Sequence, residues 1–118
     1  MSQLSSLFAS HGSDKDRNGY SSLYNALFLP LKDAPVTLLE VGVGTMIPGA
    51  HSSMKGYMPD SYQPGASLRA WRDFFQNGEI HGVDVAPRLP VLGAAHHHAP
   101  LRLHGPRRLL CLGPAALL

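Results

Sequence analysis

The chain has few of the features that define secreted, membrane-spanning or nucleic-acid-binding proteins. It contains one cysteine, Cys111, which excludes an internal disulfide and a zinc site built from several cysteines. No apolar run approaches the roughly 20 residues that span a bilayer, and the N-terminus lacks the basic start and apolar core of a secretory signal. The net charge of +2 is too small to argue for nucleic acid or an anionic membrane as a partner. We therefore expect a cytoplasmic protein without nucleic-acid or membrane partners.

A second absence is local, because residues 86–118 contain no acidic side chain whereas residues 1–85 contain all eight. Six Lys and Arg give residues 1–85 a formal charge of −2, and four Arg give residues 86–118 a charge of +4. The second region also lacks Ser, Thr, Asn, Gln, Lys and aromatic residues, yet it holds nine leucines. We predict the N-terminal part of one domain over residues 1–85. Residues 86–118 are predicted to be a low-complexity tail that is either disordered or read in a shifted frame.

Prolines divide this tail into short pieces. They are spaced too closely for a regular helix or a central strand to persist: Pro87, Pro90, Pro100, Pro106 and Pro114. The run His96–His98 offers imidazole ligands, but three adjacent histidines cannot all face one ion in a regular strand. The sequence therefore predicts no metal site in the tail, and four arginines without interleaved aromatic residues make a weak case for nucleic acid.

Residues 1–85 predict alternating helices and strands. The segment GYSSLYNALFLPL has apolar residues at helical spacing, with Asn18 as a candidate cap and Pro30 as the end. VTLLEVG, residues 36–42, is apolar on both alternating faces apart from Thr37 and Glu40, which is typical of a central parallel strand covered on both sides.

The order continues with a long loop, a second helix and a second strand. Residues 45–65 are rich in proline and glycine, and loops of this length are often functional. ASLRAWRDFF places Leu68, Trp71 and Phe75 on one helical face, and EIHGVDV, residues 79–85, reads as a strand. The strand–helix–strand order predicts an α/β fold, namely an incomplete Rossmann-like, doubly wound sheet of two strands followed by an irregular tail. Two strands alone rarely fold stably.

The residues with chemical potential lie where these two strands end. Gly42 and Gly44 follow the first strand, and Asp84 lies near the end of the second. Ligands of open α/β sheets bind at the carboxyl ends of the strands, glycines let the backbone approach a ligand closely, and a carboxylate accepts both hydroxyls of a ribose. Together these residues predict a nucleoside site. Glycines that merely end a strand are the competing interpretation.

The spacing disfavours a dinucleotide as the ligand. The dinucleotide motif needs a third glycine and a helix that starts at once, but Ile47 occupies the third position and the next helix starts near residue 66. An NAD-dependent enzyme is therefore the weaker hypothesis. Glu40 stands two residues before Gly42, and E-x-G-x-G resembles the first motif of class I S-adenosylmethionine-dependent methyltransferases.

The resemblance extends over residues 11–85. GSDKDRNGYSSLYNALFLPL, LLEVGVG and GASLRAWRDFFQNGEIHGVDV look like the start of the macrocin and mycinamicin O-methyltransferases and cephalosporin-hydroxylase-like proteins. This resemblance implies a cofactor site formed by Glu40, Gly42, Gly44, Ser67 and Asp84, with S-adenosylmethionine as cofactor and a sugar or small-molecule hydroxyl as acceptor. Weaker candidates near the cofactor or the substrate are Asp14, Lys15 and Tyr20.

The tail departs from this family. Its members continue with further strands and an Asp-Gly-x-His-like segment that supplies metal ligands and the base, and residues 86–118 hold none of this. We therefore expect a truncated chain that is inactive as written, with no metal site and no assignable catalytic residue or acceptor. The alternative is a non-catalytic nucleoside-binding or interaction fragment that needs a partner chain, or that self-associates through exposed strand edges.

Several candidates have plain structural interpretations as well. Glu40 is equally well explained as a paired core carboxylate, and Trp71, Phe74 and Phe75 as packing residues. His81 lies within a strand next to Gly82 and is expected to be either structural or exposed. In the long loop, Tyr57 and Tyr62 either shape an acceptor pocket or lid or simply face solvent.

Overall fold

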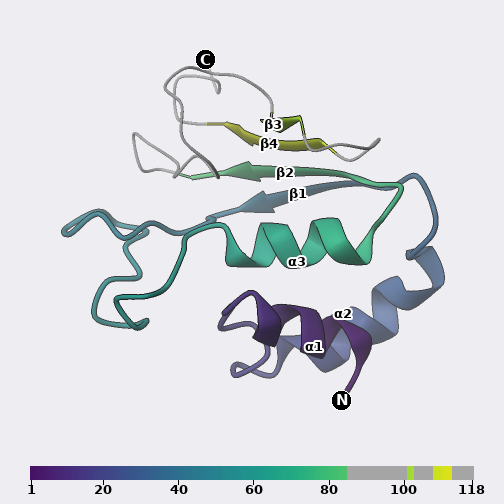
Figure 1. Ribbon diagram of the computed structural model, residues 1–118, viewed down its shortest axis with the longest axis horizontal. Helices are drawn as coiled ribbons and strands as arrows, with labels where there is room; N and C mark the ends of the chain where they lie inside the picture. The colour runs from purple at the N-terminus through teal and green to yellow at the C-terminus, as the bar shows by residue number, and fades with distance from the viewer. Residues whose placement is uncertain (85–100, 103–107, 113–118) are drawn as a thin grey trace.

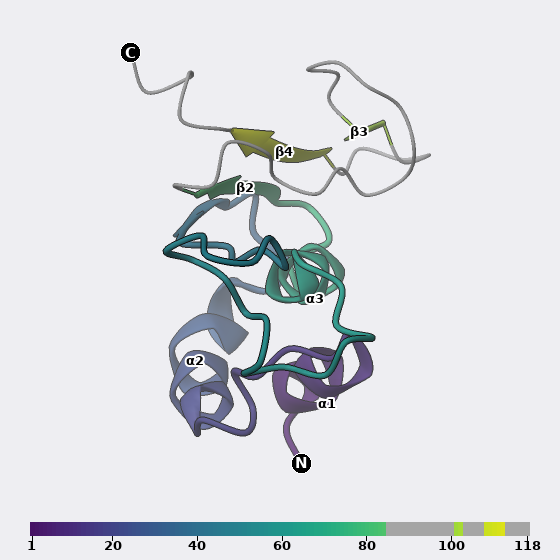
Figure 2. The same ribbon diagram turned by 90° about the vertical axis from the view of Figure 1, so that its left-hand side faces the viewer.

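The protein is a layered arrangement of a small sheet and three α-helices (Figure 1). The computed structural model describes residues 1–84, 101–102 and 108–112, the last two ranges by their backbone alone. Helix α3 packs against the sheet, and α1 and α2 lie beyond it on the side away from the strands (Figure 2). The elements are α1 (Gln3–Ser10), α2 (Tyr20–Phe28), the 3-10 helix η1 (Leu29–Leu31), β1 (Thr37–Val41), α3 (Ala66–Phe74), β2 (Glu79–Val83), β3 (Leu101–Arg102) and β4 (Arg108–Leu112).

The two predicted strands form a parallel pair joined by a helix. Thr37 lies opposite Glu79, and the register runs on to Val41 opposite Val83. The carboxyl ends of β1 and β2 therefore meet at one edge of the sheet, as the α/β prediction requires. The α/β class is confirmed. The Rossmann-like, doubly wound arrangement stays a prediction, since the described helices cover one side of the sheet (Figure 1).

The tail contributes strands that the sequence did not predict. β4 pairs with β2 in parallel, and β3 pairs antiparallel with β4, so the strand order is β1-β2-β4-β3. The expectation that no strand persists among the tail prolines is wrong here, because Arg108–Leu112 fits between Pro106 and Pro114. The remaining residues of the predicted tail, His96–His98 among them, lie outside the described part of the chain.

Aromatic side chains form the core between α3 and the other two helices. Trp71, which is 3% exposed, contacts the rings of Phe8, Tyr24 and Phe28, with centroid distances of 5.1, 5.4 and 5.6 Å. Edge-to-face aromatic pairs at this range add to the stabilisation from burial. Phe74 and Phe75 are buried in the same cluster. The packing role predicted for Trp71, Phe74 and Phe75 is confirmed.

Two features of the N-terminal helices differ from the prediction. Helix α1 was not predicted, although Leu4 and Phe8 have helical spacing and Ser2 accepts a hydrogen bond from the Ser5 amide as its cap. Helix α2 has the predicted range, but Gly19 is its cap residue and Asn18 is not. The Asn18 side chain instead donates to Asp14 at 3.0 Å.

β1 is more exposed than a central strand. Among the described residues it pairs with β2 alone, and the side chains of Leu39 and Val41 are 58% and 77% exposed. The prediction of a strand covered on both sides is therefore wrong for this chain, because a single face of β1 packs against α3. Self-association through this edge stays a prediction.

Candidate functional site

The glycine turn, residues 42–44, lies beside the end of β2. Gly42 and Gly44 have φ angles of 83° and 92°, in the left-handed region that glycine adopts without a steric penalty. The Gly42 amide donates to the Val83 carbonyl at 2.8 Å, and the Gly44 amide donates to Oδ2 of Asp84 at 2.7 Å. The structure thus brings together three of the predicted site residues. We call Gly42, Gly44 and Asp84 the half-site.

Asp84 is already engaged by a residue that the sequence did not single out. The Ser52 hydroxyl donates a hydrogen bond to Oδ1 of Asp84. The Asp84 residue is only 3% exposed. A buried carboxylate needs hydrogen-bond donors of this kind. As folded here, Asp84 therefore holds the glycine turn and the long loop together.

The first part of the long loop folds back over the half-site. Residues 45–54, the covering segment, close on themselves through Thr45, whose amide donates to the Ser52 carbonyl at 3.1 Å and whose carbonyl accepts from Met54 at 2.7 Å. Met54 lies directly against the turn, because a Cβ at Gly44 would stand 3.0 Å from its Cγ. Because Gly44 has no Cβ, the Met54 side chain can pack closely against the glycine turn.

Glu40 and Ser67 form a second group of predicted site residues. Oε1 of Glu40 accepts from the Ser67 hydroxyl at 2.6 Å and lies 3.5 Å from Nζ of Lys15, and Oε2 accepts from Nε1 of Trp71 at 3.0 Å. We call these four residues the Glu40 cluster. Both interpretations of Glu40 meet here, since it is a paired, largely buried carboxylate at the strand end that leads into the glycine turn.

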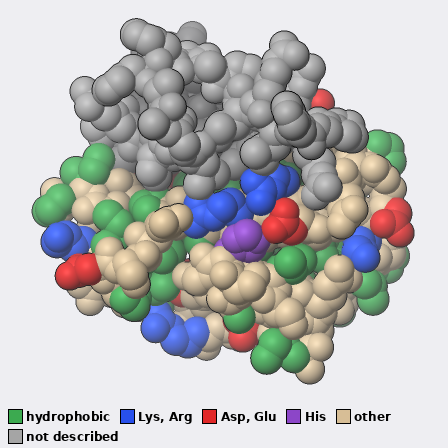
Figure 3. All heavy atoms as spheres, viewed as in Figure 1, with side chains coloured by type: hydrophobic (Ala, Val, Ile, Leu, Met, Phe, Trp, Pro, Cys, Tyr) green, Lys and Arg blue, Asp and Glu red, His purple; other side chains and the backbone are tan. Residues whose placement is uncertain are grey.

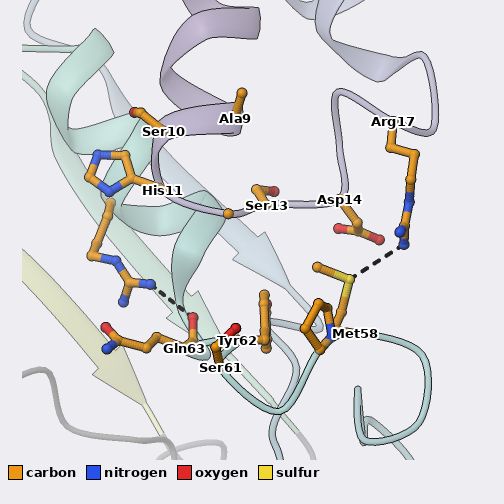
Figure 4. Close-up of a pocket in the computed structure, with 13 residues that line it drawn as sticks. Ala9, Ser10, His11, Ser13, Asp14, Arg17, Met58, Ser61, Tyr62 and Gln63 are labelled. Carbon is orange, nitrogen blue, oxygen red and sulfur yellow. Dashed lines mark hydrogen bonds between the residues drawn. The ribbon is translucent and has the colours of Figure 1, made fainter.

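A pocket of about 550 Å³ lies between the end of α1 and the second part of the long loop (Figure 4). Asp14, one of the weaker candidates, lines it, but no member of the half-site does. Tyr20 lies apart from the pocket, 48% exposed and stacked on Tyr24. The lining residues are Ala9, Ser10, His11, Gly12, Ser13, Asp14, Arg17, Met58, Pro59, Ser61, Tyr62, Gln63 and Arg69.

Burial and charge perturb the titrating groups of this pocket. Burial, reinforced by the charge of Asp14, raises the pKa of Tyr62 from its ordinary value of 10.0 to about 12. Burial also lowers the pKa of Arg69, whose guanidinium donates to the carbonyls of Pro64 and Gln63. Tyr62 thus belongs to the pocket wall. Tyr57 is 53% exposed and stacks with Arg17 instead.

An ion-pair chain borders the pocket on the α3 side. Nε2 of His11 lies 2.7 Å from Oδ2 of Asp73, and Nε of Arg72 lies 3.1 Å from Oδ1. Burial works to raise the pKa of Asp73, but the hydrogen bonds from His11 and Arg72 outweigh it and hold the pKa below its ordinary value. Acidic, basic and histidine side chains lie next to one another on the face shown in Figure 3.

The described residues offer neither a group of metal ligands nor a membrane-spanning helix. In residues 1–84 and the two short strands of the tail, no group of three His, Cys, Asp or Glu side chains is placed to hold a metal ion. In the same part of the chain, no helix has the length and apolar character needed to cross a membrane.

Two O-methyltransferases of Streptomyces olivaceus are similar to this chain. The 8-demethyl-8-alpha-L-rhamnosyl tetracenomycin-C 2'-O-methyltransferase is 37% identical over 86 residues, which cover 72% of this chain and 20% of that protein. The 8-demethyl-8-(2-methoxy-alpha-L-rhamnosyl)-tetracenomycin-C 3'-O-methyltransferase is 38% identical over 88 residues, which cover 72% and 19%. The chain is related to O-methyltransferases. The resemblance to S-adenosylmethionine-dependent methyltransferases is therefore confirmed.

The chain spans about a fifth of the length of the two curated O-methyltransferases that it matches. No protein-family model and no solved structure matches it.

Sequence reasoning missed one residue of the site and one partner of Glu40. Ser52 lies 32 residues before Asp84, and only the path of the loop brings the two together. The sequence predicts only a packing role for Trp71, yet its indole N–H also donates a hydrogen bond to Glu40. Its helical spacing from Ser67 was the available signal, since i and i+4 side chains share one face of a helix.

Proposed function

We propose that the half-site binds S-adenosylmethionine and that the protein serves O-methyl transfer to a sugar or small-molecule hydroxyl. The observation that carries the proposal is the meeting of Gly42, Gly44 and the Asp84 carboxylate at the carboxyl ends of two adjacent parallel strands. This is where open α/β sheets bind their ligands. The similarity to two O-methyltransferases supports the reaction class.

The chemistry of the half-site fits the nucleoside part of this cofactor. The glycine turn leaves backbone groups without a Cβ above them, and Asp84 offers two carboxylate oxygens that accept hydrogen bonds from a vicinal diol. When bound, S-adenosylmethionine supplies the methyl group. The residues of this chain bind and orient it, and the Glu40 cluster fixes the strand end from which the glycine turn departs.

The inactive, truncated state that the sequence suggests stays a prediction. The described residues provide the half-site, the Glu40 cluster and a polar pocket. Cofactor binding is therefore the first activity to measure, before transfer to an acceptor.

Cofactor binding is tested by titrating S-adenosylmethionine into the purified chain by calorimetry. We expect the unmodified chain to bind the cofactor. The Asp84→Ala variant is expected to have a dissociation constant at least roughly tenfold higher, because hydrogen bonds to a charged group are worth about 1.5–3 kcal/mol. Asp84→Asn retains an acceptor oxygen for the Gly44 amide and tests the loss of charge alone.

The matched control is Asp60→Ala, which removes an exposed carboxylate of the same long loop and is expected to leave the affinity unchanged. An Asp84→Ala chain that is folded and binds as tightly as the parent would contradict the proposal. NAD is titrated alongside, and tighter binding of NAD would revive the dinucleotide hypothesis.

A further inference from the structure

The half-site is filled by the chain itself. Ser52 donates its hydroxyl to Asp84, and Met54 lies against the Cα of Gly44, with its Cγ 3.0 Å from where a Cβ would stand. The Asp84 carboxylate and the backbone of Gly44, which a nucleoside would need to contact, are therefore both contacted by the covering segment, residues 45–54. With 3% of its surface exposed, Asp84 is out of reach of a ligand diol in this conformation.

We propose that Ser52 is an internal competitor for Asp84, and that the covering segment must leave the half-site before a ribonucleoside ligand binds. The ligand class is a nucleoside with a free vicinal diol, whose hydroxyls replace the Ser52 hydroxyl on the carboxylate. This inference rests on the proposed function, because it concerns access to the same half-site.

The hydrogen bonds of the covering segment allow it to move as a unit. The bonds from Thr45 to Ser52 and Met54, and from the Ser53 amide to the Ala50 carbonyl at 3.0 Å, all lie within residues 45–54. They are kept when the segment swings away. The contacts it gives up at the half-site include the Ser52 hydrogen bond to Asp84 and the packing of Met54 on Gly44.

Competition of this kind has a thermodynamic signature that differs from that of a ligand contact. When only a fraction of the molecules is open, the apparent dissociation constant equals the intrinsic constant divided by that fraction. Removing the Ser52 hydroxyl destabilises the closed state alone, so the open fraction rises and binding becomes tighter. A serine that contacted the ligand would give the opposite result.

The test is calorimetric titration of S-adenosylmethionine into the parent chain, Ser52→Ala and Ser53→Ala. We expect Ser52→Ala to bind roughly tenfold tighter, as the loss of one hydrogen bond to a charged group implies. Ser53→Ala is the matched control, because its hydroxyl accepts from the Lys55 amide at 3.3 Å and its removal is expected to leave the affinity within about twofold of the parent. The fluorescence of Trp71, the one tryptophan, verifies that each variant is folded.

A second measurement follows the segment directly. The Met54 methyl group, observed by NMR, is expected to shift when the ligand binds, whereas Met1 at the exposed N-terminus is expected to stay unchanged. Equal or weaker binding by Ser52→Ala, with binding by the parent, would overturn the competition and leave the proposed function standing. Absence of binding in both folded chains would overturn the two together. Binding by Ser52→Ala alone would support both.

Discussion

Glu40 is the residue on which the two interpretations of the site converge. Its carboxylate joins Lys15 in the first polar loop, Ser67 and Trp71 on α3, and its own strand β1. A carboxylate with two hydrogen-bond donors and a cation around it is far costlier to disturb than an exposed one. Glu40 stands two residues before Gly42, so its contacts hold in place the end of β1 from which the glycine turn departs.

We expect Glu40→Gln to lower the free energy of unfolding by about 1–3 kcal/mol. The amide keeps the shape of the side chain but replaces one acceptor oxygen with a donor and leaves Lys15 without an anionic partner. Urea unfolding followed by Trp71 fluorescence measures the loss.

Glu79→Gln is the matched control, since that side chain is 56% exposed and its pairing with His81 spans 3.6 Å. A change within about 0.5 kcal/mol is expected there. Equal losses in the two variants would mean that the Glu40 cluster adds no net stability.

At the scale of elements, Gly82 sets the distance between β2 and α3. A Cβ at this position would stand 2.6 Å from Cδ1 of Leu68 and 2.7 Å from Cγ2 of Val43. Real side chains do not approach so closely, so strand and helix would have to separate or Leu68 would have to change rotamer. The glycine is thus required by packing between the two elements.

Gly82→Ala is expected to cost about 1–3 kcal/mol of stability through overpacking. In the double variant Gly82→Ala/Leu68→Ala, the new methyl group occupies space that the leucine vacates. A double-mutant cycle by urea unfolding should therefore give a loss smaller than the sum of the two single losses. Additive losses would show that Leu68 is not the group that Gly82 makes room for.

The contact between α1 and α2 depends on one carboxylate. The hydroxyls of Ser21 and Ser5 both donate to Oδ1 of Asp16, which lies in the loop between the helices. These hydrogen bonds, that from Ser21 foremost, hold the pKa of Asp16 below its ordinary value of 3.8. They form with the charged carboxylate, so folding favours ionisation of Asp16.

The pH dependence follows from this direction. A lowered folded-state pKa contributes stability that is fully present above the unfolded-state pKa of 3.8 and is lost as the pH falls through the folded-state pKa. We expect the parent chain to exceed Asp16→Asn in Tm at neutral pH and the difference to shrink in acid below that value. Asp60→Asn, in the exposed part of the long loop, should show no such pH-dependent difference. A Tm difference that persists unchanged in acid would contradict this role.

For the whole molecule, periodic sequence patterns predicted several helices and strands, but they did not predict the long-range contacts between loop residues. β1, α3 and β2 follow from alternation and helical spacing, because those patterns reflect which faces are buried. Gly42, Gly44 and Asp84 could be placed together because parallel strands end at one edge. The closure of Ser52 onto Asp84 could not, since it depends on the path of an irregular loop. The proline spacing of the tail predicts no strand there, yet the seven residues between Pro106 and Pro114 are enough for the five-residue strand Arg108–Leu112.

The parallel pairing of β1 with β2 also governs how this chain reaches its native state. Thr37 and Glu79 are partners in the sheet although 42 residues separate them in sequence. Closing a loop of that length costs about 3 kcal/mol of chain entropy before any strand contact repays it. No local hairpin can nucleate this pair, so we expect the helices to collapse around Trp71 first and strand pairing to follow. We expect the high contact order of the β1–β2 pair to make its assembly the slow step, and both edges of β1 to stay unpaired until β2 joins it.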